Sequence, residues 1–209
     1  MNIVVFGATG LTGGLVLERA LAAGHNVVAL VRDPSKLNLQ HARLEVRKGN
    51  PLSTSDVEGC LAGANAVIHC LGIGGKGDGQ RTTLISDSVK LILAAMAKHD
   101  VSRIVCMSNV GAGGSGMWFA NRIIVPLFLR WLLPIIEDKN RMEQALRESN
   151  TEWVSVRLPQ ITTGPARPVR VSDNGRNIGL KITAESAADF LLAQTESSLH
   201  LRSAPSISN

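Results

Sequence analysis

The chain has 209 residues, of which 44% are hydrophobic and 19% charged, and this balance excludes a disordered chain. Its length suits a single domain over residues 1–209 with a substantial core. The net charge of +5 favours anionic partners, but scattered basic residues and only 3% aromatic residues disfavour a nucleic-acid-binding protein.

Short apolar runs alternate with amphipathic stretches along most of the chain. In chain order they predict strand Asn2–Phe6, helix Leu11–Ala23, strands Val27–Val31 and Ala42–Lys48, helix Ser53–Ala62, strand Ala66–Leu71, helix Thr83–Lys98, strand Arg103–Met107, helix Lys139–Ser149, strand Glu152–Leu158 and helix Ala184–Thr195. This alternation predicts an α/β fold, a doubly wound and mostly parallel sheet (Rossmann fold) with helices on both faces. The polar tail His200–Asn209 is expected to be frayed.

Two segments interrupt the alternation. Gly72–Gly79 is a glycine-rich loop, and Met117–Ile136 is strongly apolar, within an insertion at about 110–136 that we expect to be helical. Two arginines and two prolines interrupt the apolar run, so we expect no transmembrane segment. It is interpreted as a segment packed over a substrate cleft, with a dimer face or a membrane-surface patch as alternatives.

The cysteines and the start of the chain bear on its compartment. Cys60, Cys70 and Cys106 form no paired motif, so we expect buried free thiols in a reducing compartment and no metal site. A strand-like run follows Met1 directly, without the charged region that opens a signal peptide. We therefore expect a cytoplasmic protein.

A glycine motif joins the first predicted strand to the first predicted helix. Glycines at this junction allow a tight turn and let the backbone approach a pyrophosphate, while the helix N-terminus favours negative charge. The spacing is GxxGxxG, and its place between strand and helix strengthens an otherwise weak pattern. The expected cofactor-binding residues here are Gly7, Thr9, Gly10, Leu11, Thr12 and Gly13.

The end of the second predicted strand bears on the choice between NADP and NAD. Arg32 stands where an NAD-binding site carries an acidic residue, and Lys36 follows one turn later. Both side chains can pair with a 2′-phosphate, which favours NADP(H) over NAD(H). Asp33 is adjacent and offers the alternative of a carboxylate on the ribose.

The chain resembles the atypical short-chain dehydrogenase/reductases, in the group of flavin reductase and biliverdin-IXβ reductase. The likeness spans about residues 1–195 and rests on the glycine motif, VRDPSK, Gly49-Asn50, Leu71-Gly72, Cys106-Met107-Ser108-Asn109, Asn140-Arg141-Met142, Leu146-Arg147-Glu148-Ser149 and Arg157-Leu158-Pro159-Gln160. It implies Asn50 near the adenine, where the family usually has aspartate, and Gly72 near the pyrophosphate or ribose. It also implies Ser108 beside the nicotinamide, and the backbone of Pro159 and Ile161 on the carboxamide.

The standard catalytic pair of short-chain dehydrogenases is Tyr-x-x-x-Lys, and the chain contains no tyrosine. Lys139 and Glu143 match the rest of that helix, and Ile135 stands in the tyrosine position. The standard alcohol-dehydrogenase mechanism is therefore excluded. Ser108 and Lys139 are the candidate catalytic residues, one to orient the nicotinamide or the acceptor, the other to contact the ribose or an acidic acceptor.

Hydride transfer by positioning remains. We expect an NADPH-dependent reductase that acts on a flat small-molecule acceptor such as a flavin, a quinone or a linear tetrapyrrole, with Trp118, Phe119, Phe128 and Trp131 available for an aromatic wall. The main alternative is an NADP(H)-binding sensor without turnover. Both a monomer and a homodimer are compatible with the sequence.

Overall fold

The computed structural model describes residues 1–73, 79–115 and 130–209. The main sheet has eight strands in the order β3-β2-β1-β4-β5-β6-β10-β8. Their bounds are β1 Asn2–Phe6, β2 Asn26–Val31, β3 Leu44–Lys48, β4 Ala66–His69, β5 Arg103–Gly113, β6 Glu152–Leu158, β8 Arg170–Ser172 and β10 Ser206–Ser208. All neighbours pair in parallel except β10 and β8, which are antiparallel. The predicted doubly wound sheet is confirmed.

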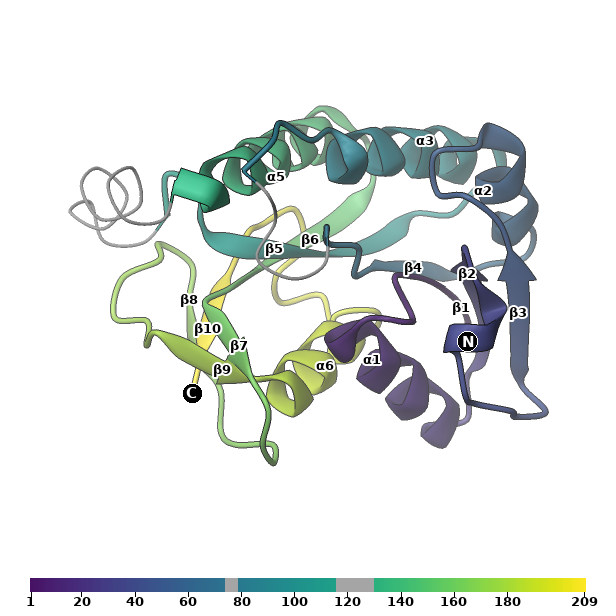
Figure 1. Ribbon diagram of the computed structural model, residues 1–209, viewed down its shortest axis with the longest axis horizontal. Helices are drawn as coiled ribbons and strands as arrows, with labels where there is room; N and C mark the ends of the chain where they lie inside the picture. Colours follow the sequence, from purple (N-terminus) through teal and green to yellow (C-terminus); the bar gives the residue numbers. More distant parts are fainter. Residues whose placement is uncertain (74–78, 116–129) are drawn as a thin grey trace.

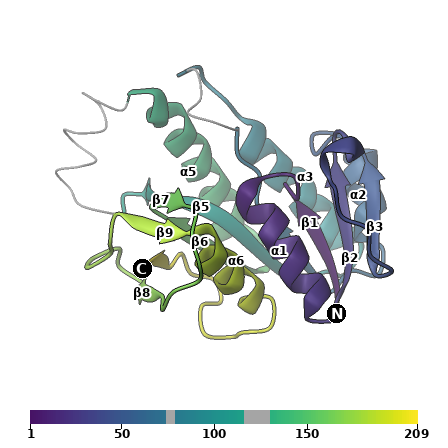
Figure 2. The same ribbon diagram turned by 60° about the horizontal axis from the view of Figure 1, so that its bottom comes forward.

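Helices cover both faces of this sheet (Figure 1). On one face lie α2 (Thr54–Leu61), α3 (Leu84–Lys98) and α5 (Leu133–Glu148), and on the other lie α1 (Leu11–Ala22) and α6 (Ala184–Ala193). Figure 2 shows α1 and α6 side by side, where Arg19 forms ion pairs with Glu185 and Asp189. Two short 3-10 helices, η1 (Pro34–Lys36) and η3 (Arg130–Leu132), complete the helical elements of the described chain.

Each face of the sheet has its own hydrophobic core. On the α1 and α6 side the fully buried residues include Ile3, Val5 and Leu191, and on the other side they include Phe6, Ile92 and Met142. Strand residues that alternate in sequence therefore serve opposite cores, as a sheet covered on both faces requires. The parallel strands end at one edge, and that edge carries the glycine motif.

Several predicted boundaries were wrong. The fifth strand continues to Gly113, and the helix predicted at Lys139 begins six residues earlier at Leu133, with Pro134 in its first turn, where proline costs no hydrogen bond. The apolar segment thus contributes η3 and the start of α5. Trp118, Phe119, Phe128 and the remainder of that segment lie outside the described residues.

The tail is not frayed, which corrects the prediction for His200–Asn209. Ser206–Ser208 forms a buried strand between β6 and β8, and Ile207 is fully buried. The Asn209 side chain accepts from the Thr183 backbone N at 3.0 Å and donates to Ser186 Oγ at 2.7 Å. A second, two-stranded sheet of β7 (Gln160–Thr162) and β9 (Lys181–Thr183) was also not predicted. These strands are three residues long, too short for a period of two to be recognised.

Candidate functional site

The glycine motif forms a turn that admits no side chains at two of its positions. Gly7 has φ +86°, and a Cβ there would lie 2.7 Å from the backbone C and O of Cys70 at the end of β4. A Cβ on Gly13 would overlap the carbonyl group of Gly7. The Gly10 N donates to the Gly7 O at 3.0 Å and closes the turn. The conformation therefore requires glycine for steric reasons.

Helix α1 begins directly after this turn without a side-chain cap, because its N-cap residue is Gly10. Its first turn contains no acidic residue. Uncapped amides at a helix N-terminus attract an anionic group such as a pyrophosphate. Thr9, Gly10 and Leu11 are exposed at this end, with Leu11 57% exposed, whereas Thr12 is buried. The local structure fits the predicted dinucleotide.

At the end of β2, Asp33 is engaged by its own loop. Its Oδ1 accepts from the Ser35 backbone N at 3.1 Å and from Ser35 Oγ at 2.7 Å, and it caps η1. The hydrogen bonds from Ser35 lower the pKa of this exposed carboxyl. Arg32 and Lys36 are exposed, and Arg32 has no ion pair or hydrogen bond with any described residue. This arrangement leaves the arginine available to an anion beside the loop.

The loop after β3 is also closed on itself. The Asn50 backbone N donates to Asp56 Oδ2 at 2.8 Å, and Asn50 Oδ1 accepts from the Leu52 N at 3.0 Å. The exposed amide nitrogen of Asn50 remains available as a donor. A Cβ on Gly49 would lie 2.8 Å from Leu30 Cδ1, so the glycine lets this loop pack against β2.

Five of the predicted site residues line one pocket of about 220 Å³ at the carboxyl edge of the sheet. They are Gly72, Ser108, Lys139, Pro159 and Ile161. Apolar side chains surround them, including Ile85, Ile135 and Trp131, the one predicted aromatic wall residue that the structure describes. Cofactor-type pockets commonly combine an apolar lining with a few polar groups in this way.

Lys139 is buried within the fold, at 1% exposure. Its Nζ donates to the Met107 carbonyl O on β5 and, at 3.3 Å, to the Leu71 carbonyl O after β4. Burial lowers the pKa of Lys139 to about 8, against the opposing influence of Cys106, Cys70, Asp138 and Glu143. This lysine therefore joins the ends of two strands and keeps an ammonium group at the pocket below that pH.

Glu143 lies one turn further along α5 and is fully buried. Its Oε1 accepts from Ser108 Oγ at 3.0 Å, from Ser155 Oγ at 3.2 Å and from Arg157 Nε at 2.9 Å. Its Oε2 accepts from Arg157 Nη2 at 2.6 Å and from Arg147 Nη2 at 2.8 Å. Burial alone would raise the pKa of Glu143, but the hydrogen bonds and charge of Arg157, with Ser108 and Arg147, hold it below its usual range.

Sequence reasoning identified Glu143 as part of a helix pattern and did not place it in the site. The available signal was its spacing of four from Lys139, which puts both side chains on the same face of one helix. Arg157 and Ser155 come from β6, and no spacing rule connects them to Glu143. A second buried carboxylate, Asp138, accepts from the Ile85 and Ser86 backbone N atoms at 2.9 and 3.1 Å and so anchors the start of α3.

The remaining titratable candidates have structural roles. His69 is fully buried, with Nε2 2.9 Å from Ser88 Oγ, and desolvation lowers its pKa to about 3, so it is neutral at physiological pH. Cys60, Cys70 and Cys106 are free and buried, and burial raises the pKa of each thiol, that of Cys70 to about 12. These results confirm the prediction of buried free thiols.

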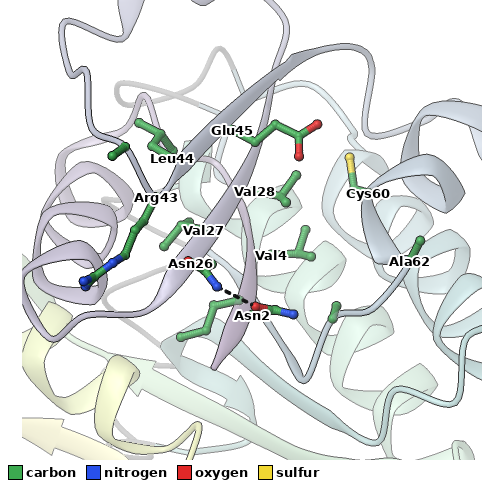
Figure 3. Close-up of a pocket in the computed structure, with 13 residues that line it drawn as sticks. Asn2, Val4, Asn26, Val27, Val28, Arg43, Leu44, Glu45, Cys60 and Ala62 are labelled. Carbon is green, nitrogen blue, oxygen red and sulfur yellow. Dashed lines mark hydrogen bonds between the residues drawn. The ribbon is translucent and has the colours of Figure 1, made fainter.

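A larger pocket of about 340 Å³ lies at the opposite end of the sheet (Figure 3). It is lined by residues that begin β1, β2 and β3, among them Asn2, Asn26 and Leu44. Asn26 Nδ2 donates to Asn2 Oδ1 at 3.0 Å, and Asn2 Nδ2 donates to the Gly63 O, so both amides are engaged within the fold. None of the predicted site residues lines this pocket.

Neither a membrane-spanning helix nor a metal-binding cluster occurs among the described residues. No helix among them is long and apolar enough to cross a membrane. No cluster of three or more histidine, cysteine or acidic side chains within residues 1–73, 79–115 and 130–209 is arranged to hold a metal ion.

Comparison with known proteins assigns the family. The model of the NAD(P)H-binding family matches residues 7–198. An uncharacterised protein of Mycobacterium tuberculosis is 28% identical over 77% of this chain, which spans only 15% of that protein's length. A Veillonella parvula short-chain dehydrogenase/reductase solved with NADP superposes with a TM-score of 0.83, at 14% identity over 100% of this chain and 94% of its own. The Lactococcus lactis oxidoreductase ylbE superposes with a TM-score of 0.81, at 17% identity over 100% and 91%. At these identities the structural likeness shows the fold.

Proposed function

Because the chain belongs to the NAD(P)H-binding family, we propose that it is an NADPH-dependent reductase of a flat small-molecule acceptor. The observation that carries the proposal is the pocket of about 220 Å³, where Ser108 and Lys139 meet an apolar lining. The apolar lining supports a flat acceptor such as a flavin, a quinone or a linear tetrapyrrole. The proposed partner is thus a small molecule and not a nucleic acid, and the buried free thiols favour the cytoplasm.

The residues of this chain fit the dinucleotide at three places. The turn Gly7–Gly13, whose tight course requires glycine at Gly7 and Gly13, and the uncapped start of α1 would hold the pyrophosphate. Asn50, in the loop after β3, would lie beside the adenine. Gly72, Pro159 and Ile161 border the pocket for the nicotinamide end. When bound, the reduced nicotinamide supplies a hydride, which carries two electrons and one proton, and becomes oxidised.

Arg32 and Lys36 support NADP(H) over NAD(H). The Asp33 carboxylate, the competing ligand for the ribose, is turned onto Ser35 by two hydrogen bonds. Arg32 carries the positive charge that would pair with a 2′-phosphate, and no described residue neutralises it. The local geometry thus favours the phosphorylated cofactor.

The chain's own residues would contribute positioning and charge. Lys139 places an ammonium group beside the ends of β4 and β5, where it would attract electron density as the acceptor gains the hydride. Without a tyrosine in the chain, the second proton that the reduced acceptor takes up would come from solvent. Acceptors that need no strong protein acid match this site.

The proposal is tested by isothermal titration of the protein with NADPH and NADH, followed by NADPH oxidation with FMN, a benzoquinone and biliverdin. We expect NADPH to bind more tightly than NADH, and at least one acceptor to be reduced. Binding of NADPH without turnover on any of the three would contradict a reductase and favour a sensor. Failure to bind either cofactor would contradict the proposed site itself.

A further inference from the structure

The single hydroxyl hydrogen of Ser108 is already used in a hydrogen bond within the fold. Ser108 Oγ is buried and donates to Glu143 Oε1 at 3.0 Å. An ionised carboxylate can only accept hydrogen bonds, so the direction of this bond is fixed. The two lone pairs of the hydroxyl remain, and none of the described residues donates to them. Towards the pocket, Ser108 is therefore a hydrogen-bond acceptor.

Glu143 has little freedom to release that hydrogen. Arg157 holds both carboxylate oxygens at 2.9 and 2.6 Å, and Arg147 adds a third bond from a nitrogen at 2.8 Å. Such paired, charge-assisted bonds fix both the position and the charge of a carboxylate. Ser155 donates to the same Oε1 at 3.2 Å, but it does not line the pocket. The network thus sets the hydroxyl direction of Ser108 without touching a ligand itself.

Lys139, one turn before Glu143 on α5, is a hydrogen-bond donor, whereas Ser108 is an acceptor towards the pocket. Two of the three ammonium hydrogens are donated to the carbonyl oxygens of Leu71 and Met107. The third has no partner within the described chain, and Lys139 lines the same pocket as Ser108. The Met107 carbonyl that Lys139 holds belongs to the residue before Ser108. The pocket therefore offers a donor and an acceptor next to each other.

We propose that Glu143 is a positioning residue that fixes Ser108 as a hydrogen-bond acceptor, so that the pocket selects acceptor molecules carrying an N–H beside a carbonyl. This inference rests on the proposed reductase function and narrows its substrate class. The carbonyl would face Lys139 and the N–H would face Ser108. A flavin imide and a tetrapyrrole lactam carry such an edge. A quinone carries only oxygens that accept, and it would leave Ser108 unpaired or repelled.

The test compares lumiflavin with its N3-methyl derivative, which lacks the imide hydrogen, in the wild-type protein and two variants. Ser108→Ala removes the acceptor at the pocket, and Ser155→Ala removes the equivalent bond to Glu143 outside it. In the wild type and in Ser155→Ala, we expect methylation to lower kcat/KM about tenfold or more, the effect of leaving a buried hydrogen-bonding group unpaired. In Ser108→Ala, the lumiflavin rate should fall by that factor, and the two flavins should differ by less than about twofold.

Several results would overturn the assignment. Equal losses in both serine variants would show that Ser108 acts only through the Glu143 network. A faster methylated flavin in Ser108→Ala, with an unchanged lumiflavin rate, would show a steric effect. A raised dissociation constant for NADPH without any change in flavin discrimination would place Ser108 on the cofactor carboxamide. A benzoquinone, which has no N–H to donate, serves as the internal control: its rate should be unchanged in Ser155→Ala and should stay the same or rise in Ser108→Ala, and a fall there equal to the lumiflavin loss would refute the assignment.

Equilibrium binding separates this assignment from the reductase proposal. Quenching of flavin fluorescence, measured with NADP⁺-saturated protein, reports the same discrimination without turnover. Selective binding of lumiflavin with no oxidation of NADPH would refute the reductase and leave the Ser108 assignment standing. Turnover without discrimination would refute the assignment and leave the reductase standing. Absence of both binding and turnover would contradict both.

Discussion

Arg32 is the residue on which the cofactor preference depends. It is exposed at the end of β2, and the neighbouring Asp33 is engaged by Ser35. We expect Arg32→Glu to weaken NADPH binding by about 1–3 kcal/mol and NADH binding far less, because a charge-assisted phosphate contact is replaced by repulsion. Calorimetric titration of each cofactor measures the difference. Arg43→Glu is the matched control, since Arg43 is exposed at the other end of the sheet. Equal losses for both cofactors in Arg32→Glu would contradict this role.

Lys139 predicts a pH dependence of the reaction. Burial lowers its pKa to about 8, so the ammonium loses its proton as the pH rises through that value. We expect kcat/KM to fall on the alkaline side of about pH 8, and Lys139→Met to lack this decline. A pH profile of both proteins measures it. An unchanged alkaline decline in Lys139→Met would assign the titration to another group.

The same pKa shift makes a prediction about stability. The unfolded chain keeps the lysine proton up to the ordinary lysine pKa of 10.5, whereas in the folded chain the pKa of Lys139 is about 8. Between these pH values the unfolded state binds more protons than the folded state. The contribution of Lys139 therefore raises the free energy of unfolding as the pH increases from about 8 to 10.5. The cost of the buried charge is present in full below about pH 8.

At the scale of elements, the end of β5 is shaped by the Arg157–Glu143 pair. Gly113 has φ +58°, and a Cβ there would lie 3.0 Å from Glu143 Oε2 and overlap the Arg157 guanidinium. Gly114 has φ +73°, with no atom within 4 Å of such a Cβ. We expect Gly113→Ala to lower the free energy of unfolding by about 1–3 kcal/mol more than Gly114→Ala, because only the first must displace the ion pair. Urea unfolding of both variants separates the effect of the clash from the backbone strain that the two variants share. Equal losses of unfolding free energy would contradict a clash at Gly113.

The elements also show how far the sequence could predict the fold and the site. The glycine motif and the five long helices were predictable because a strand, a turn and an apolar stripe lie within one short window. Ser108 and Lys139 were found through family motifs, and the structure brings them to one pocket. Glu143 with Arg157 and Ser155 was not predictable as a cluster, because its members come from α5 and β6 and meet only in the folded sheet.

For the whole molecule, the tail is the clearest case of context overriding local sequence. Ser206–Ser208 carries a single apolar residue, Ile207, yet it joins β6 to β8 and completes the sheet. Ile207 is fully buried, and Leu199 is 80% exposed. We expect Ile207→Ala to cost about 2–5 kcal/mol of unfolding free energy and Leu199→Ala less than about 0.5 kcal/mol. Denaturant unfolding measures both changes. Similar losses of unfolding free energy in the two variants would show that the tail does not stabilise the fold.

The most direct test of the reductase is a single-turnover experiment without oxygen. Protein saturated with NADPH is mixed with an equal amount of flavin, and the absorbances of reduced nicotinamide and oxidised flavin are followed together. We predict that the two absorbances decay with one rate constant. Deuterium at the transferred position on C4 of the nicotinamide should slow both decays equally. The contrary result is that NADPH stays bound and reduced while the flavin stays oxidised, and that biliverdin and a benzoquinone also stay oxidised. This result would contradict a reductase and favour a cofactor-binding sensor.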